Sequence, residues 1–257
     1  MSAMCGISAA RVRQVLNETD VLADCMEMYR EYAPPVDSLA CLWTRVVPAD
    51  GAAIRVMPDA CSDLIWRAGH GAFVAGPDTE AWLSSAPAGS VLVGARFRPG
   101  VGGPALGFPL SELLNQRVDL NELNPRLDEQ LPPDLSAEAA LERVAAAAAQ
   151  LAQPPDPAMR AAVRRLDDPR ARVELLADEL GFSERQLRRR FHAAVGYGPK
   201  TLQRVLRFRR FLAQADAGDD LARAALDAGY ADQAHLTRDC ARLSGLTPGR
   251  LALERTS

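Results

Sequence analysis

VELLADELGFSERQLRRRFHAAV, residues Val173–Val195, is the stretch that decides the fold of the C-terminal part of this chain. A short segment with helical apolar spacing ends at Gly181, where glycine readily adopts the left-handed backbone that commonly ends a helix. Ser183 is a good N-cap for a second helix. That helix carries one apolar stripe at helical spacing: Leu187, Phe191, Ala194 and Val195. Two short helices joined by a tight glycine turn are therefore predicted.

The polar side of the second helix is rich in arginine. The residues between its apolar positions are Arg185, Gln186, Arg188, Arg189 and Arg190. A pair of short helices whose second member carries Arg and Gln is typical of a helix-turn-helix, in which that helix enters the major groove of DNA. A first helix-turn-helix unit is predicted over residues 173–195.

The pattern recurs 48 to 49 residues later in ALDAGYADQAHLTRDCARLSG, residues Ala225–Gly245, with one extra residue in the turn. The matched pairs are Gly181 with Gly229, Leu187 with Leu236, Phe191 with Cys240, Gly196 with Gly245, and Pro199 with Pro248. A second unit is therefore predicted over residues 221–243. A long helix over 199–214 is expected to join the two units, since its apolar positions alternate with arginines.

The last hundred residues or so resemble the DNA-binding domain of the AraC-type transcription regulators. The motifs that carry the resemblance are Leu176–Phe191, Ala228–Arg238 and the ending Gly245–Arg250. The resemblance implies two recognition helices, bridged by a long helix, that enter successive major grooves on one face of DNA. Cys240 stands where the family usually has an aromatic residue, so the core of the second unit is expected to be less well filled there.

The charge of the chain is unevenly distributed. The net charge is −3, but the residues from Ala158 onward include 19 basic and 13 acidic ones, and the remainder 11 basic and 20 acidic ones. A cationic part joined to an anionic part is what a nucleic-acid binder with a separate sensor would show. A solvated surface is the alternative interpretation of the charge alone.

Reading bases in the major groove needs paired donors or acceptors near the start of a recognition helix, Arg for guanine and Gln or Asn for adenine. Arg185 and Arg189 share a helix face, and Arg238 is the counterpart of Arg189 in the second unit. The candidate base contacts are Arg185, Gln186, Arg189, Gln233, His235 and Arg238. The candidate phosphate contacts are Arg188, Arg190, Lys200, Arg204 and Arg207. For each arginine, a phosphate contact or a surface ion pair is the alternative.

The first half of the chain has a different pattern, with short apolar runs separated by Pro, Gly, Asp and Ser. Strands are predicted at Leu39–Val47, Ala53–Met57, Asp63–Trp66, Ala72–Ala75, Ala81–Leu83 and Ser90–Phe97. This spacing predicts a small barrel or sandwich. Helices are predicted at 110–114, 120–123 and 136–151.

This half also resembles a domain often attached to the same module in bacteria. The similarity lies in Met57–Trp66, Gly76–Pro77 and Gly94–Gly100. A cupin-like β-barrel is the usual sensor of the AraC-type regulators, and the resemblance carries it over as an expectation.

The expected fold class is α+β and multidomain, with a β-rich N-terminal domain and an all-α C-terminal domain that holds two helix-turn-helix units. The expected divisions are an N-terminal extension (1–33), a β-rich sensor or dimerisation domain with C-terminal helices (34–152), a proline-rich linker (153–157) and a DNA-binding domain (158–257). The linker is placed at Gln153–Pro157 because prolines without an apolar pattern resist both helix and strand.

A group of charged residues in the β-rich half is a candidate effector site. Asp59 and Asp63 flank Cys61, while Arg96 and Arg98 lie two apart on a presumed strand and should share a face. A pocket would use them with Trp66 or Trp82. The candidate effector residues are thus Asp59, Asp63, Trp66, Arg96 and Arg98. Turn, core and ion-pair roles are the alternative for each.

Several classes of protein are disfavoured. The chain has no apolar run long enough for a membrane helix and no secretory signal at its start. Its five cysteines are widely spaced without C-x-x-C, which favours a reducing cytoplasm and argues against disulfides or structural zinc. His192 and His235 have no Cys/His cluster at ligand spacing, so neither a metal nor another cofactor is expected.

The sequence predicts a cytoplasmic, non-enzymatic transcription regulator whose partner is promoter DNA. RNA polymerase and a small-molecule effector are further candidate partners, and the chain is expected to be a monomer or a homodimer. Two alternatives stay open. The chain could be a DNA-tethered enzyme or repair protein that uses Cys61, although neighbouring carboxylates should raise the pKa of that thiol. The N-terminal domain could also serve only to dimerise.

Overall fold

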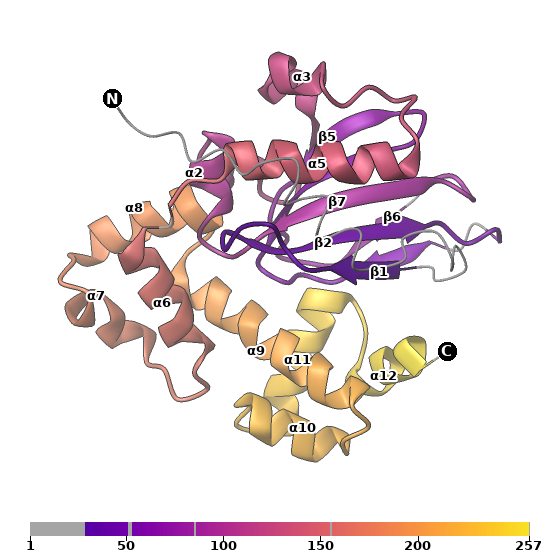
Figure 1. Cartoon of the computed structure of the whole chain (residues 1–257). Helices are drawn as coiled ribbons and strands as arrows, with labels where there is room; N and C mark the ends of the chain where they lie inside the picture. Colours follow the sequence, from indigo (N-terminus) through magenta and orange to yellow (C-terminus); the bar gives the residue numbers. More distant parts are fainter. Residues whose placement is uncertain (1–28, 51–52, 85, 155, 257) are drawn as a thin grey trace.

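The computed structural model describes residues 29–50, 53–84, 86–154 and 156–256. It consists of a β-rich domain followed by a helical domain, with the two packed against each other (Figure 1). The expected two-domain fold class is confirmed. Most of the expected N-terminal extension lies outside the described residues, but its end, Tyr29–Tyr32, forms strand β1 of the sheet.

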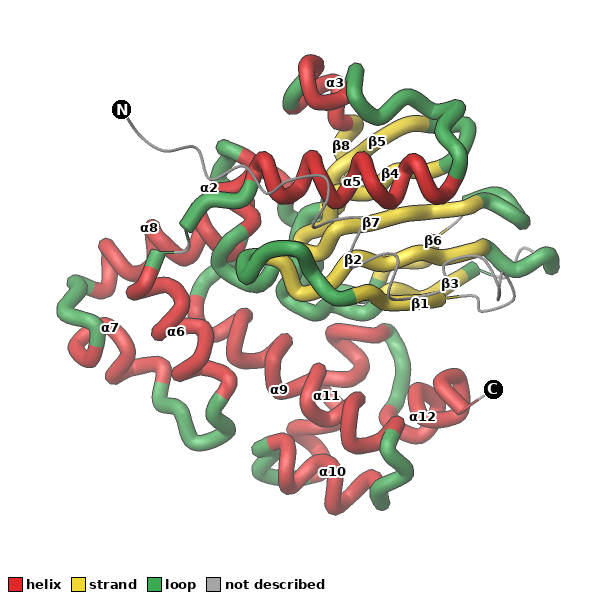
Figure 2. Tube along the Cα trace, viewed as in Figure 1, coloured by secondary structure: helices red, strands yellow, loops and turns green. Residues whose placement is uncertain are grey.

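The β-rich domain is built on a six-stranded antiparallel sheet in the order β1-β2-β7-β4-β5-β8, with a separate two-stranded ribbon, β3-β6 (Figure 2). The strands of the sheet are β1 (Tyr29–Tyr32), β2 (Leu39–Val46), β4 (Ser62–Arg67), β5 (Gly71–Ala75), β7 (Val91–Phe97) and β8 (Arg117–Asp119). The ribbon pairs β3 (Ile54–Val56) with β6 (Trp82–Ser84). All six strands predicted between residues 39 and 97 are present, within two residues at each end.

One face of the sheet is covered by helix α5 (Ala137–Leu151), which begins at the N-cap Ser136. Because side chains alternate along a strand, Leu64 and Trp66 of β4 point toward this helix and pack with Leu141 in the main core of the domain. Short helices complete the domain: α2 (Gly102–Leu106), the 3-10 helix η1 (Leu110–Leu113), α3 (Leu120–Leu123) and α4 (Pro125–Asp128).

The opposite face of the sheet, together with the ribbon, bounds a cavity of about 500 Å³. From β4, Asp63, Ile65 and Arg67 line this cavity, so the same alternation that buries Trp66 against α5 turns charged residues inward here. The β-rich domain therefore has an apolar core on one side of its sheet and a cavity with charged walls on the other.

The helical domain contains two helix-turn-helix units joined by α9, as predicted. Its helices are α6 (Pro157–Asp167), the 3-10 helix η2 (Val173–Leu175), α7 (Leu176–Glu179), α8 (Glu184–Val195), α9 (Pro199–Asp216), α10 (Leu221–Ala228), α11 (Gln233–Ser244) and α12 (Pro248–Thr256). The first helix of the first unit is divided into η2 and α7. Gly181 and Gly229 adopt positive φ angles of 70° and 93° in the two turns.

The stripes predicted from helical spacing form the core of this domain. Leu187 and Phe191 of α8 are buried with Phe208 of α9 and Leu236 of α11. Cys240 is fully buried, at 0 % exposure, at the position that corresponds to Phe191. The smaller side chain therefore still occupies the core of the second unit.

The two domains meet along α8 and near the end of α11. Gly103 of α2 lies so close to α8 that a Cβ there would be 2.1 Å from the carbonyl oxygen of Ala193. Arg55 of β3 donates a hydrogen bond of 3.0 Å to the carbonyl oxygen of Ser244 and forms an ion pair with Glu254. The β-rich domain thus contacts both helix-turn-helix units.

Within the described part of the chain, no helix is long and apolar enough to cross a membrane. No cluster of three or more His, Cys, Asp or Glu side chains suited to a metal ion occurs among the same residues.

Candidate nucleic-acid interface and sheet-domain cavity

The first recognition helix, α8, begins with a capping box. The Ser183 side chain accepts a hydrogen bond from the Gln186 backbone amide, and Gln186 Oε1 accepts one of 2.9 Å from the Ser183 backbone amide. This arrangement satisfies amides at the helix start that have no partner within the helix. A base contact by Gln186 would have to use its amide nitrogen or open the capping box.

Four arginines follow on α8 in two different settings. Arg185, Arg188 and Arg189 are exposed, with Arg185 and Arg189 on one face as predicted. Arg190 instead forms an ion pair of 2.8 Å with Asp156, and its guanidinium lies 4.5 Å from the centre of the Phe182 ring. Asp156 also caps α6 through the Ala158 amide, so Arg190 ties the first unit to the start of the domain.

The second recognition helix, α11, begins at the N-cap Asp232, whose side chain accepts a hydrogen bond of 2.6 Å from the His235 amide. Gln233 and Arg238 are exposed, as a base-reading role requires. Arg242, one turn beyond Arg238, is exposed as well. Its i+4 spacing from Arg238 was the signal in the sequence that would have added it to the candidates.

Three of the predicted DNA contacts lie in an internal polar cluster between α9 and α11. The buried carboxylate of Asp239, 6 % exposed, lies 3.3 Å from Arg204 Nε and 3.8 Å from Arg207 Nη1. His235 Nε2 lies 2.7 Å from Arg207 Nη1, and its ring packs edge-on against Tyr230. We call Arg204, Arg207, His235 and Asp239 the α9–α11 cluster. Arg204, Arg207 and His235 are half-buried, and their first partners are within the protein.

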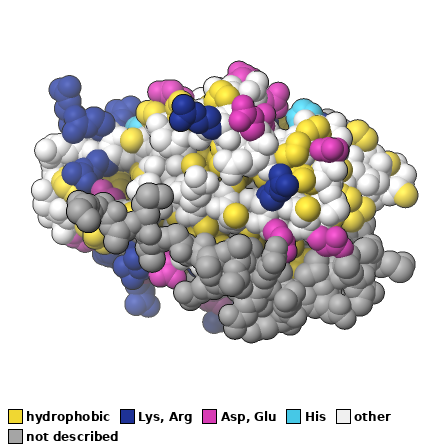
Figure 3. Space-filling model, turned by 45° about the horizontal axis from the view of Figure 1, so that its top comes forward, with side chains coloured by type: hydrophobic (Ala, Val, Ile, Leu, Met, Phe, Trp, Pro, Cys, Tyr) yellow, Lys and Arg dark blue, Asp and Glu magenta, His cyan; other side chains and the backbone are white. Residues whose placement is uncertain are grey.

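A basic groove of about 580 Å³ lies between the two units. Its charged lining consists of Arg172, Lys200, Arg204, Arg207, Arg238 and Arg242 with the acidic Glu174 and Asp239. Lys200 is exposed and lies 3.6 Å from Glu174. Figure 3 shows Lys and Arg side chains gathered at the end of the molecule that carries the first unit. The excess of positive charge suits a surface that meets phosphates.

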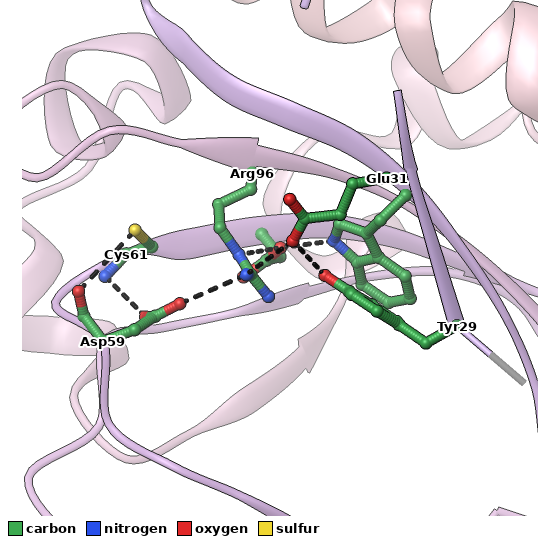
Figure 4. A network of polar contacts seen from close by, with 7 residues as sticks. Tyr29, Glu31, Asp59, Cys61 and Arg96 are labelled. Atoms are coloured by element: carbon green, nitrogen blue, oxygen red, sulfur yellow. Dashed lines mark hydrogen bonds and ion pairs between the residues drawn. The ribbon is translucent and has the colours of Figure 1, made fainter. Parts of the chain in front are cut away.

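The β-rich domain brings three of the predicted effector residues together in its cavity. Asp63 and Arg96 are register partners on β4 and β7, and Arg96 Nε lies 3.2 Å from Asp63 Oδ1. Arg96 Nη1 lies 3.4 Å from Asp59 and 3.9 Å from Glu31, so the guanidinium is surrounded by carboxylates (Figure 4). Asp63 and Asp59 together raise the pKa of Arg96 above its usual value.

Two predicted effector residues do not line this cavity. Trp66 lies on the α5 side of the sheet, where its Nε1 donates a hydrogen bond of 2.8 Å to the carbonyl oxygen of Pro132. Arg98 follows the end of β7 and donates to the carbonyl oxygen of Asp37. The expectation that Arg96 and Arg98 share a strand face is wrong, because the strand ends at Phe97 between them.

Other cavity residues were missed in the sequence. Trp43 donates a hydrogen bond of 2.7 Å from Nε1 to Asp63, and the Tyr29 hydroxyl donates one of 2.6 Å to Glu31. Alternation along the predicted strand Leu39–Val47 would have placed Trp43 and Arg45 on one face. Arg117, which was also missed, forms a bidentate ion pair with Asp78. Its guanidinium lies over the ring of Trp82, which was predicted for the pocket and lines the cavity.

Cys61 lies in a setting that disfavours a nucleophilic role. The residue is buried, and its backbone amide donates a hydrogen bond of 2.9 Å to Asp59 Oδ1. Burial, and then the Asp59 carboxylate, raise the pKa of the thiol well above its usual value. The reactive thiolate form is therefore rare at neutral pH. This geometry argues against the alternative of an enzyme that uses Cys61.

The comparisons with known proteins agree with this geometry. Residues 176–253 match the family model described as "Helix-turn-helix domain", which covers α7 to α12 and both recognition helices. The C-terminal domain is therefore a helix-turn-helix DNA-binding domain of the AraC type. Residues 33–119 match the model "Domain of unknown function (DUF6597)", which covers most of the sheet.

Among solved structures, the crystal structure of ToxT from Vibrio cholerae O395 is similar to the chain, with a TM-score of 0.47 and 10 % sequence identity. The similarity covers 90 % of this chain and 99 % of ToxT. At that level of similarity, nothing about ToxT carries over to this protein. No curated protein matches the chain.

Proposed function

We propose that this regulator reads a two-part DNA site, with α8 in one major groove and α11 in the next groove on the same face of the duplex. The observation that carries the proposal is that both recognition helices pack on one continuous 18-residue helix, α9. Because a single helix sets their separation, the two halves of the site should lie about one helical turn, or 10 bp, apart.

In this proposal Arg185 and Arg189 of α8 and Gln233 and Arg238 of α11 are the base-reading side chains. All four are exposed and lie in the first two turns of their helices, where recognition helices contact base edges. Arg188, Lys200 and Arg242 are the matching phosphate contacts. Arg204 and Arg207 line the basic groove but are also ion-paired with Asp239, so they rank below these three as phosphate contacts.

The experiment is selection of bound DNA from a random pool with the full-length protein. Two conserved blocks about 10 bp apart support the proposal. A single block, or enrichment that follows only base composition, contradicts it. The Arg238→Ala variant should lose sequence preference in one block and keep it in the other.

We further infer that the β-rich domain controls this activity by binding a small molecule. Its cavity of about 500 Å³ lies within the size range of ligand pockets and combines aromatic walls with a few charged groups. The cavity is lined in part by Arg55, which bonds to the end of α11. A compound that raises the thermal stability of the protein in a saturable way would support this role over dimerisation alone.

The expected cytoplasmic location belongs to the same proposal, because a promoter-binding protein acts where the DNA is. Contact with RNA polymerase and the choice between monomer and homodimer stay predictions from the sequence. Sedimentation with and without the selected DNA site would decide the oligomeric state.

A further inference from the structure

The cavity face of the six-stranded sheet is ordered in rows that run across the strands. Arg45 of β2 and Arg67 of β4 are both register partners of Leu92 on β7, one from each side. We call these three residues the cationic row. Two residues further along the strands, Trp43 and Ile65 flank Gly94 in the same way, and we call these three residues the apolar row.

The next row contains Arg96 and Asp63, whose charges are already paired. Along the strands, the cavity wall therefore passes from the cationic row to the apolar row and then to the ion pair of Arg96 with Asp63. All three rows line the same space of about 500 Å³, apart from Gly94, over which the Trp43 ring lies.

The two arginines of the cationic row differ from the other cavity arginines because neither has an acidic partner among the described residues. Arg96 is paired with Asp63 and Asp59, Arg117 with Asp78, Arg55 with Glu254, and Arg255 with Asp216. Among the residues that the structure describes, no carboxylate lies within ion-pair distance of Arg45 or Arg67. Both side chains are only partly exposed.

Arg45 is held in place without such a partner. Its guanidinium lies 4.7 Å from the centre of the Tyr29 ring, and burial lowers its pKa below the usual value. A partly desolvated cation without an anion is costly, and a bound anion would remove that cost. Arg45 and Arg67 lie on the two strands that flank Leu92, so an anionic group above Leu92 would lie between the two arginines.

The apolar row provides a flat surface beside the cations. A Cβ on Gly94 would lie 2.2 Å from Cε2 of Trp43, so the absence of a side chain lets the indole lie directly on the sheet. Ile65 and its register partner Phe73 extend this floor toward β5. Two residues along a strand span about 7 Å, which is the distance from the cationic row to the middle of the floor.

We propose that this cavity binds a small organic carboxylate, with the carboxylate between Arg45 and Arg67 and an apolar body about one ring in size over Trp43. This inference rests on the proposed role of the β-rich domain as an effector domain. Arg guanidinium groups pair with carboxylates in a planar geometry, and aromatic side chains favour a flat apolar body.

The test is isothermal titration of the full-length protein with benzoate, phenylacetate and indole-3-acetate. Phenylacetamide is the neutral analogue of phenylacetate, and 2-phenylethylamine is the cationic analogue. We expect at least one of the acids to bind, and the amide and the amine to bind at least tenfold more weakly than the corresponding acid. If none of the acids binds at millimolar concentration, or if the amide or amine binds as well as the acid, the inference is wrong.

Variants locate the site. Arg45→Gln and Arg67→Gln should each weaken binding of the acid about tenfold. Arg98→Gln is the matched control, since Arg98 lies outside the cavity, and it should bind the acid as the wild type does. Equal affinity in all three variants would show that the acid binds elsewhere and would overturn the assignment.

DNA binding in the absence of acid separates this inference from the proposed function. Arg45→Gln and Arg67→Gln should bind the selected DNA as the wild type does, because both residues belong to the sheet and neither is part of α8 or α11. A protein that binds the acids at this site but selects no DNA would refute the proposed function and leave the carboxylate site standing.

Discussion

Arg189 and Arg190 are adjacent in the sequence but lie in different surroundings. Arg189 is exposed on the face of α8 that carries Arg185, whereas Arg190 is paired with Asp156 and stacked on Phe182. Sequence alone could list both as arginines of a recognition helix. The structure distinguishes them, because Arg190 already has partners within the protein whereas Arg189 is exposed and can contact DNA.

The first prediction compares these two residues. Arg189→Ala should weaken binding to the preferred site by about 1–3 kcal/mol and relax the preference at one base. Arg190→Ala should keep the base preference. Fluorescence anisotropy with the selected site and with single-base variants of that site measures both the affinity and the base preference. If Arg189→Ala lost the same affinity for every DNA sequence, Arg189 would be a phosphate contact and not a base contact.

The second prediction concerns the buried thiols. Burial raises the pKa of Cys41 to about 12 and that of Cys240 to about 12, and it raises the pKa of Cys61 well above its usual value. A raised thiol pKa lowers the thiolate fraction at any pH below it, so labelling should stay slow from pH 7 to pH 9.

The measurement is the rate of reaction with a thiol-specific reagent in a chain with Cys5→Ser and Cys25→Ser. The unfolded chain, which has the same three cysteines, is the control and should react at the rate of a free thiol. Rapid labelling of Cys61 in the folded protein would revive the alternative of a cysteine-dependent enzyme.

At the scale of elements, α9 and α11 are joined by the buried α9–α11 cluster. Asp239 faces Arg204, Arg207 and His235, and one of its oxygens, Oδ2, has no hydrogen-bond partner among the described residues. A buried carboxylate surrounded by cations fixes the orientation of the second recognition helix on the helix that also supports the first.

The third prediction is that Asp239→Asn destabilises the protein by about 3 kcal/mol, because it leaves partly buried arginines without their counter-charge. Asp227→Asn, which removes one member of an exposed i,i+4 pair with Arg223, is the control and should have little effect. Chemical denaturation followed by circular dichroism measures both. Equal free energies of unfolding for the two variants would mean that the α9–α11 cluster does not stabilise the packing of α11 on α9.

The elements show what the sequence can and cannot predict. Helices α8, α9 and α11 follow from local signals, namely their caps, glycine turns and apolar stripes. Strands β1 and β8 were missed because each is short, and β8 pairs with β5, which is not its neighbour in the sequence. The charged group of the cavity was found only in part. Asp59, Asp63 and Arg96 were candidates, whereas Glu31 joins them through the pairing of β1 with β2, which no local pattern sets.

For Trp66 and Arg98, however, the sequence did contain the needed information. Trp66 lies three residues from Asp63, an odd separation that places the two side chains on opposite faces of a strand. Arg98 is followed directly by Pro99 and Gly100, which favour the end of a strand. Both corrections follow from strand geometry.

At the scale of the whole molecule, the β-rich domain lies against the first recognition helix. Pro109 and Ser111 border a hollow of about 690 Å³ together with Arg185 and Arg189, the proposed base-reading residues of α8. A helix in the major groove has a phosphate backbone on each side. In this arrangement, the segment at Pro109 lies where DNA bound to α8 would approach.

The fourth prediction is that Gly103→Ala loosens this contact, since its Cβ would lie 2.1 Å from the carbonyl oxygen of Ala193. The variant should be cleaved faster in the segment 152–156 by limited proteolysis and should bind DNA more tightly than the wild type. Gly249→Ala, where a Cβ meets no atom within 4 Å, is the matched control. Unchanged cleavage and affinity would show that the contact does not restrain α8.

The central claim is that α8 and α11, fixed on α9, read one face of the duplex together. The most direct measurement is the affinity of the full-length protein for its selected site with and without 5 bp inserted between the two blocks. Because 5 bp turns one block to the opposite face, affinity should fall to that of a site with a single block. Equal affinity for the two spacings would contradict the claim.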